Sequence, residues 1–161
     1  MKKVLAILLC LVICLFFVGC NSTKDIFVFD NLEIEVKMQI DEAIRVSQDN
    51  DIMLVSDIKN NDAIGVISIV KEEGMNIDEI YDTYIIGDGE RTKTVFSDEL
   101  IFVEIINKVD SVVLGERVDK MYCFIFYDEG TGTLLFGRFF ENSERDYVIS
   151  LAKSIEVLKI Q

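Results

Sequence analysis

The sequence contains no histidine, no proline and no tryptophan in its 161 residues. The absence of histidine excludes Ser-His-Asp and Cys-His catalytic arrangements, and it excludes every zinc site that uses an imidazole ligand. Cysteine is also scarce, because three of the four, Cys10, Cys14 and Cys20, lie in the first twenty residues. Cys123 is the one cysteine in the rest of the chain, so a disulfide within that part is excluded.

Basic residues are few, with 16 Lys and Arg against 29 Asp and Glu, a net charge of −13. Lys2 and Lys3 are the only charged residues before Asn21, so the chain from residue 20 onward carries −15. Such a charge repels phosphate backbones, and we therefore expect no nucleic-acid partner. It also repels anionic lipid headgroups, so the domain is expected to stand off a membrane surface. Because half of the residues are hydrophobic, disorder is excluded.

The first twenty residues hold a long apolar run. Lys2 and Lys3 precede uninterrupted apolar residues over 4–18, and Gly19 and Cys20 close the run. A positive start, an apolar stretch and a small residue at its end are typical of an export signal. The alternative is a membrane anchor, but a helix over 4–18 spans roughly 22 Å, against a hydrocarbon core of about 30 Å. We therefore expect residues 1–19 to form a signal helix that is removed.

Phe17-Val18-Gly19-Cys20 resembles the lipobox of bacterial lipoproteins. In that family the cysteine thiol receives a diacylglycerol, and the chain is then cut just before the cysteine. The resemblance implies that Cys20 becomes a lipidated N-terminus, followed by a polar tether over 20–25. Several acyl chains together anchor a protein stably where one does not. The expected location is the extracytoplasmic face of the cell membrane, with the lipid on Cys20 as the membrane contact.

Residues 26–161 are expected to form a single domain made mostly of short strands. Leu32, Ile34, Val36 and Met38 alternate with charged residues, which predicts a strand that is buried on one face. The predicted strands cover residues 26–29, 32–38, 52–58, 63–70, 93–96, 100–107, 111–118, 121–127 and 133–140, with a further strand from Glu156.

Two helices are predicted among these strands. Asn76 and Glu79 form a capping box for the first helix, and Gly87 provides its stop. Ser143 is the expected cap of the second helix. Residues 40–48 fit a third, short helix only weakly.

Sequential strands joined by short turns predict an α+β fold with a single antiparallel β-sheet flanked by two or three helices, after the N-terminal signal helix. This element order, over about residues 26–160, resembles the PsbP-like and DcrB-like group, whose members are small antiparallel sheets flanked by helices. The resemblance implies an accessory or binding role rather than catalysis, and it assigns no functional residue.

Three motifs outside the signal could carry chemistry. Cys123 has apolar neighbours, whereas a reactive thiol needs a nearby cation or base, so we predict a buried structural cysteine. Ser56 and Lys59 fit an S-x-x-K motif, but residues three apart on a strand point to opposite faces. The sequence 130–132, Gly-Thr-Gly, is predicted to be a hairpin turn because a strand, and not a helix, follows it.

Acidic and aromatic clusters complete the candidates. The acidic stretches 49–51, 88–90 and 128–129 and Asp62 lack EF-hand spacing, so we predict a solvated surface and no metal or cofactor site. Seven aromatic residues gather on one hairpin, where they either fill the core or line a groove for an apolar ligand or partner. They are Tyr122, Phe124, Phe126, Tyr127, Phe136, Phe139 and Phe140.

The sequence therefore predicts a membrane-anchored lipoprotein whose domain is not an enzyme and binds a protein partner in the cell envelope. No catalytic residue is assigned. The alternative is a solute- or lipid-binding lipoprotein with a pocket between sheet and helices. A hydrolase that uses carboxylates alone ranks third, because no carboxylate pair can be selected from so many acidic residues.

Overall fold

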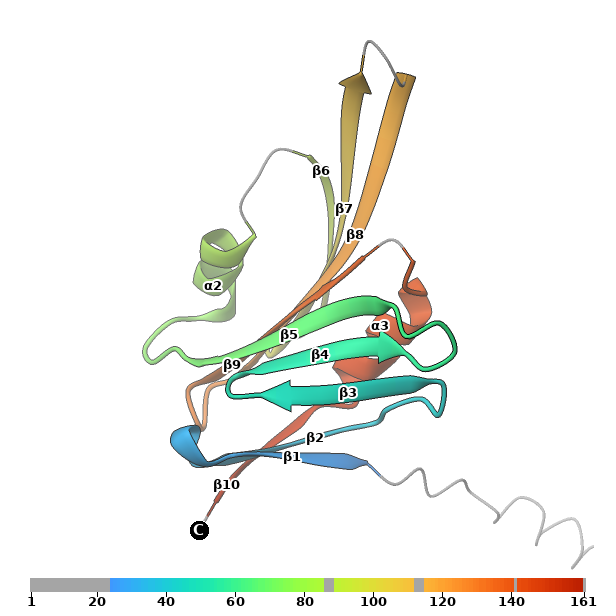
Figure 1. Cartoon of the computed structure of the whole chain (residues 1–161). Coiled ribbons are helices and arrows are strands. Elements are labelled where there is room, and N and C mark those ends of the chain that lie inside the picture. The colour runs from blue at the N-terminus through green and yellow to red at the C-terminus, as the bar shows by residue number, and fades with distance from the viewer. Residues whose placement is uncertain (1–23, 86–88, 112–114, 141, 161) are drawn as a thin grey trace, which may run out of the picture.

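The computed structural model describes residues 24–85, 89–111, 115–140 and 142–160 (Figure 1). The predicted signal helix over 1–19, the predicted lipidation site Cys20 and most of the tether lie outside these residues. No helix among the described residues is long and apolar enough to cross a lipid bilayer.

The described residues form ten strands, two α-helices and one short 3-10 helix. In chain order these elements are β1 (Asp25–Phe29), η1 (Asp30–Leu32), β2 (Ile34–Met38), β3 (Ile44–Asp49), β4 (Ile52–Asp57), β5 (Ala63–Lys71), α2 (Ile77–Tyr84), β6 (Glu90–Ser97), β7 (Leu100–Ser111), β8 (Gly115–Asp128), β9 (Thr133–Phe139), α3 (Arg145–Lys153) and β10 (Glu156–Lys159). All strand pairs are antiparallel, so the predicted α+β class with antiparallel sheets is confirmed.

The prediction of a single sheet is wrong, because the described strands form two. The small sheet has the order β1-β2-β10, and the large sheet has the order β3-β4-β5-β9-β8-β7-β6. The chain leaves the small sheet after β2, where the backbone N–H of Gln39 donates to Ser154 Oγ at 2.8 Å. β2 then takes β10, at the far end of the chain, as its second neighbour. A pattern of short local turns cannot reveal such a distant pairing.

Residues 40–48, which fitted a helix weakly, instead contain most of β3. Ile44 and Val46 are half-buried, whereas Arg45 and Ser47 are exposed, so the side chains follow a period of two. β3 pairs with β4 along its whole length, for example Val46 with Val55. Tertiary pairing therefore decides the conformation of this segment.

The predicted strands 100–107, 111–118 and 121–127 are in fact two long strands. β7 continues to Ser111, and β8 runs from Gly115 to Asp128. The two pair continuously from Leu100↔Phe126 to Ser111↔Gly115, so the polar residues that suggested breaks lie inside a regular ladder. This hairpin extends well past the neighbouring strands β6 and β9 (Figure 1).

The two helix caps had different outcomes. The capping box of α2 is confirmed: Asn76 Oδ1 accepts from the backbone of Asp78 and Glu79, and Glu79 Oε2 accepts from the backbone of Asn76 at 2.9 Å. α2 ends at Tyr84, and the predicted stop Gly87 lies outside the described residues. Ser143 is not the cap of α3, because its hydroxyl donates to the Phe140 carbonyl and Glu144 occupies the cap position.

Two apolar layers hold the elements together, one on each face of the large sheet. The inner face of the small sheet and one face of α3 enclose the first layer, where Ile34, Val36 and Met38 are fully buried, as their alternation predicted. The second layer lies beneath α2 around Ile80 and Ile125. The two helices therefore cover opposite faces of the large sheet (Figure 1).

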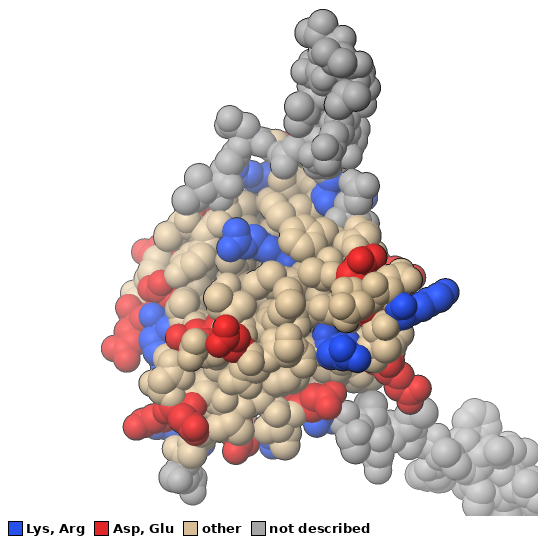
Figure 2. Space-filling model, viewed as in Figure 1, with Lys and Arg blue, Asp and Glu red and all other residues tan. Residues whose placement is uncertain are grey.

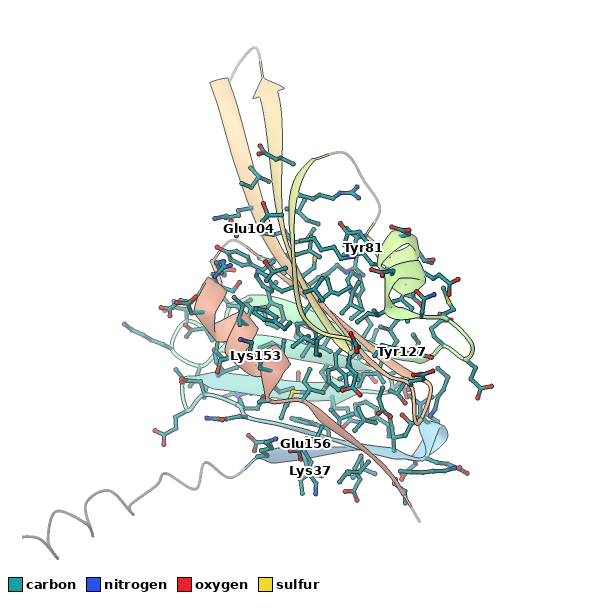
Figure 3. All side chains as sticks on the ribbon, turned by 180° about the vertical axis from the view of Figure 1, so that it is seen from behind. Lys37, Tyr81, Glu104, Tyr127, Lys153 and Glu156 are labelled. Atoms are coloured by element: carbon teal, nitrogen blue, oxygen red, sulfur yellow. The ribbon has the colours of Figure 1, made fainter. Side chains whose placement is uncertain are left out.

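Lysine side chains link both helices to the edge strand β6, and Figure 3 labels two of the residues involved, Tyr81 of α2 and Lys153 of α3. Lys93 Nζ lies 2.7 Å from Asp78 Oδ1 and 4.2 Å from the ring centroid of Tyr81, both on α2. Lys153 of α3 lies 3.9 Å from the ring centroid of Phe96. Exposed pairs of this kind contribute about 1 kcal/mol or less each, so the apolar layers dominate the docking of the helices.

Two phenylalanine rings lie directly over glycine residues of the neighbouring strands in the large sheet. Phe124 stands opposite Gly137 in the β8–β9 register, and Phe139 stands opposite Gly65 in the β5–β9 register. A Cβ atom at Gly137 would lie 2.2 Å from Phe124 Cε1, and one at Gly65 would lie 2.4 Å from Phe139 Cδ1. Each ring therefore occupies the space that a side chain would need.

We expect Gly137→Ala to lower the free energy of unfolding by about 1–3 kcal/mol, since the fully buried Phe124 ring must leave its position. Gly130→Ala is the matched control, because its nearest neighbours would lie 3.8 Å from the new Cβ, in ordinary contact. Urea unfolding of both variants measures the difference. Equal stability of Gly137→Ala and the wild type would contradict the packing described.

Candidate functional site

One side of the molecule exposes the edges of both sheets. Within the described chain, β1 ends the small sheet and β3 ends the large sheet. A hollow of about 340 Å³ lies between these two strands, and we call it the β1/β3 groove. It is lined by Asp25, Phe27, Ile40, Asp41, Glu42, Ile44 and Val46.

The floor of the β1/β3 groove consists of apolar side chains at the edge of the first apolar layer. Phe27, Ile40, Ile44 and Val46 are only half-buried, and all four pack against the first apolar layer. At one end, Gln48 Nε2 of β3 donates to the Val28 carbonyl of β1 at 2.7 Å and ties the two edges together. The groove therefore has an apolar floor and lies beside a strand edge that has backbone groups available for pairing.

Carboxylates lie along the β1/β3 groove. Asp25, Asp41 and Glu42 all line it, and each is exposed. Asp41 Oδ1 accepts from the backbone N–H of Ala43 at 2.8 Å, which fixes the turn that leads into β3. An apolar slot with acidic residues around it suits a segment that combines apolar and basic side chains.

The outer face of β4 and β5 is a second apolar surface, on the opposite side of β3 from the groove, and we call it the β4 face. Ile52 and Leu54 are 49% and 39% exposed. Leu54 stands opposite Val66 of β5, so these side chains share one face of the sheet. Figure 2 shows a largely uncharged surface here, with both acidic and basic side chains around its margin.

The β4 face is exposed because α2 covers only part of the large sheet. The side chains beneath α2 come from β7, β8 and β9, and they include Ile101, Ile125 and Phe136. No described element lies over Ile52 and Leu54. Contiguous exposed apolar side chains of this kind mark interaction surfaces more often than single ones do.

A larger hollow, of about 830 Å³, lies elsewhere, between η1, the β5–α2 loop and the β8–β9 turn. Two of its polar side chains are paired within the protein. Lys71 Nζ donates to the Thr131 carbonyl at 2.8 Å and to Thr133 Oγ1 at 3.2 Å, and Tyr127 donates to the Glu72 carbonyl at 2.7 Å. These contacts fix the loops around the hollow, so Lys71 and Tyr127 already have a structural role.

Cys123 has the environment that the sequence predicted. It is 1% exposed in the layer beneath α2, where Ile125 and Tyr127 share its face of β8. Burial raises the pKa of its thiol to about 12, although the charge of Arg138 opposes the shift. Because the thiolate is the reactive form, this cysteine is inert at neutral pH.

The other sequence candidates are not brought together into a site. Ser56 lies in β4 and Lys59 in the turn after it, and residues 130–132 form the β8–β9 turn, as predicted. Of the acidic stretches, residue 88 is outside the described chain. The described residues contain no group of three or more His, Cys, Asp or Glu that could hold a metal ion.

The seven aromatic residues of the hairpin are mostly core. Tyr122, Phe124, Tyr127, Phe136 and Phe139 are buried, whereas Phe126 is half-buried and Phe140 is 48% exposed. The apolar groove lies instead between β1 and β3, in segments that the sequence pattern did not single out. A usable signal was the run Ile52-Met53-Leu54-Val55, which is apolar on both faces although the sheet buries only one.

No family model, no curated protein and no solved structure matches this chain. The resemblances to lipoproteins and to the PsbP-like and DcrB-like group therefore stay predictions.

We expect the stability of the protein to fall as the pH rises above about 9, in part because of Cys123. The unfolded chain loses the thiol proton near pH 9, whereas the folded chain keeps it to about pH 12. Between these values each further pH unit therefore stabilises the unfolded state relative to the folded one. Urea titrations at pH 8 to 10 should show the wild type losing up to about 1.4 kcal/mol per unit more than Cys123→Ala. Parallel curves for the two proteins would contradict this burial.

Proposed function

We propose that this chain is a lipid-anchored protein of the extracytoplasmic membrane face, with a non-catalytic domain that binds a protein partner. The observation that carries the binding role is the uncovered β3 margin, with the β1/β3 groove on one side and the β4 face on the other. The lipobox-like sequence around Cys20 supports the anchor.

Strand addition is the mode of binding that this margin suits best. An extended segment that paired with β3 would continue the large sheet by one strand. Its side chains would alternate between the groove, beside Ile44 and Val46, and the outer face, beside Arg45 and Ser47. Main-chain hydrogen bonds then supply affinity, and the groove selects apolar side chains flanked by basic ones.

The filling of the helix–sheet interfaces supports a protein partner over a ligand held between sheet and helices. Buried side chains such as Ile80 and Ile125 occupy the space beneath α2, and Val148 and Leu151 occupy the space beneath α3. The β1/β3 groove lies between two sheet edges, and the hollow of about 830 Å³ is bordered by loops.

The anchor is tested by Cys20→Ala. We expect this variant to lack the mass of the acyl chains and to lose most of its membrane association, since the apolar run alone is short for a bilayer. Intact mass and fractionation of cells measure both effects. Cys123→Ala is the matched control and should remain lipidated and membrane-bound. Equal membrane binding by an unlipidated Cys20→Ala would show that the lipobox interpretation is wrong.

The partner is tested by photo-crosslinking in cells, with a benzophenone amino acid placed at Arg45 on β3, at Leu54 on β4, or at Val95 on the far edge strand. We expect one stoichiometric protein adduct at residues 45 and 54 and none at 95, which is 58% exposed. Ile52→Gln should weaken the adduct at residue 54 several-fold, whereas Val95→Gln should not. No adduct at either site, or the same adduct at all three, would contradict binding at the β3 margin.

A further inference from the structure

The small sheet has an outward face that nothing in the described chain covers. Ile26 and Val28 of β1 and Leu158 of β10 are 55%, 44% and 42% exposed. The register places Ile26 and Glu156 on either side of Lys37, and Val28 and Leu158 on either side of Glu35. These six side chains therefore form one surface of two rows, which we call the outer small-sheet face.

This face is electrically balanced on a protein that is otherwise strongly acidic. Lys24 Nζ lies 2.7 Å from Glu156 Oε1, and the resulting hydrogen bond lowers the pKa of Glu156, with a smaller effect from Lys37. Together with Glu35, the face and its margin carry two positive and two negative charges. Figure 3 shows Lys37 and Glu156 next to each other on the small sheet.

The chain places the same face beside the predicted anchor. β1 begins at Asp25, five residues after Cys20. A fully extended chain spans at most about 3.6 Å per residue, so β1 begins within roughly 18 Å of the lipidated residue. The small sheet is therefore the part of the domain that a lipid on Cys20 would hold nearest to the bilayer.

We propose that the outer small-sheet face rests on the lipid headgroups of the membrane to which Cys20 is anchored. This inference rests on the proposed lipidation of Cys20. The overall charge repels an anionic surface, but the field of surface charges is screened within about 10 Å, so the charge of the nearest face has the greatest weight. The balanced face has the least repulsion to overcome, and its three apolar side chains suit the headgroup boundary.

A weak contact is sufficient because the tether makes it intramolecular. A short linker holds the face at an effective concentration in the millimolar range, so a millimolar affinity for the membrane surface is sufficient. Contact through this face would also fix the orientation of the domain. The β3 margin would then lie beside the bilayer surface, within reach of other anchored proteins.

The test uses the lipidated full-length protein, purified from membranes and reconstituted in vesicles of phosphatidylcholine and phosphatidylglycerol. An environment-sensitive NBD label is attached to a cysteine at one position in each variant: Ile26→Cys or Leu158→Cys on the face, and Ile52→Cys or Val95→Cys as controls with similar exposure. Cys123 stays unlabelled, because its thiol is buried. Flotation of the vesicles reports anchoring separately from the fluorescence.

We expect all four variants to float with the vesicles, and a blue shift with higher NBD intensity at residues 26 and 158 only. Flotation without that shift, or with an equal shift at all four positions, would overturn the membrane contact and leave the anchor intact. Failure to float would overturn the anchor and this inference together. Protection of residues 26 and 158 in native membranes but not in protein-free vesicles would assign the face to a protein and overturn the proposal.

A longer tether gives a second measurement. Insertion of about twenty Gly and Ser residues after Thr23 keeps the lipid but lowers the effective concentration of the face by roughly tenfold. We expect flotation to persist while the NBD signal at residue 26 falls toward its value in solution. An unchanged signal would show that the tether does not bring about the contact.

Discussion

The fold depends on how closely other elements can approach the centre of the large sheet. In β9 and β5, Gly137 and Gly65 leave space that the rings of Phe124 and Phe139 fill, with centroids 6.1 Å apart. Both rings are fully buried in the layer shared with the small sheet and α3. Larger residues at the two glycines would force the rings into the rest of this layer, and the layer would lose its close packing.

The same arrangement explains why the two faces of the large sheet have different neighbours. One face is covered along most of its width by the small sheet and α3, because the rings and the alternating residues of β2 provide a broad apolar surface. The other is covered only over β7 to β9, where the short helix α2 lies. The apolar outer residues of β4 are consequently left in contact with solvent, beside a groove that opens between two sheet edges.

The sequence predicted correctly those features that depend on interactions between residues close together in the chain. The alternation of Ile34, Val36 and Met38, the capping box at Asn76 and the turn at residues 130–132 all depend on neighbouring residues, and the structure confirms them. The division into two sheets depends on β10 pairing with β2, and the strand conformation of residues 44–49 depends on β4. The exposure of Ile52 and Leu54 depends on where α2 docks, so a strand could be predicted there but not its role as a surface.

The pairing of β10 with β2 also has a consequence for the order in which the chain can fold. β10 follows all other strands in the sequence, yet it completes the sheet that contains the first two. During synthesis, β1 and β2 therefore emerge long before their last neighbour, and Val36 remains without Val157 beside it until then. The layer closest to the N-terminus of the domain is thus the last to close, and a chain whose synthesis is incomplete keeps that side open.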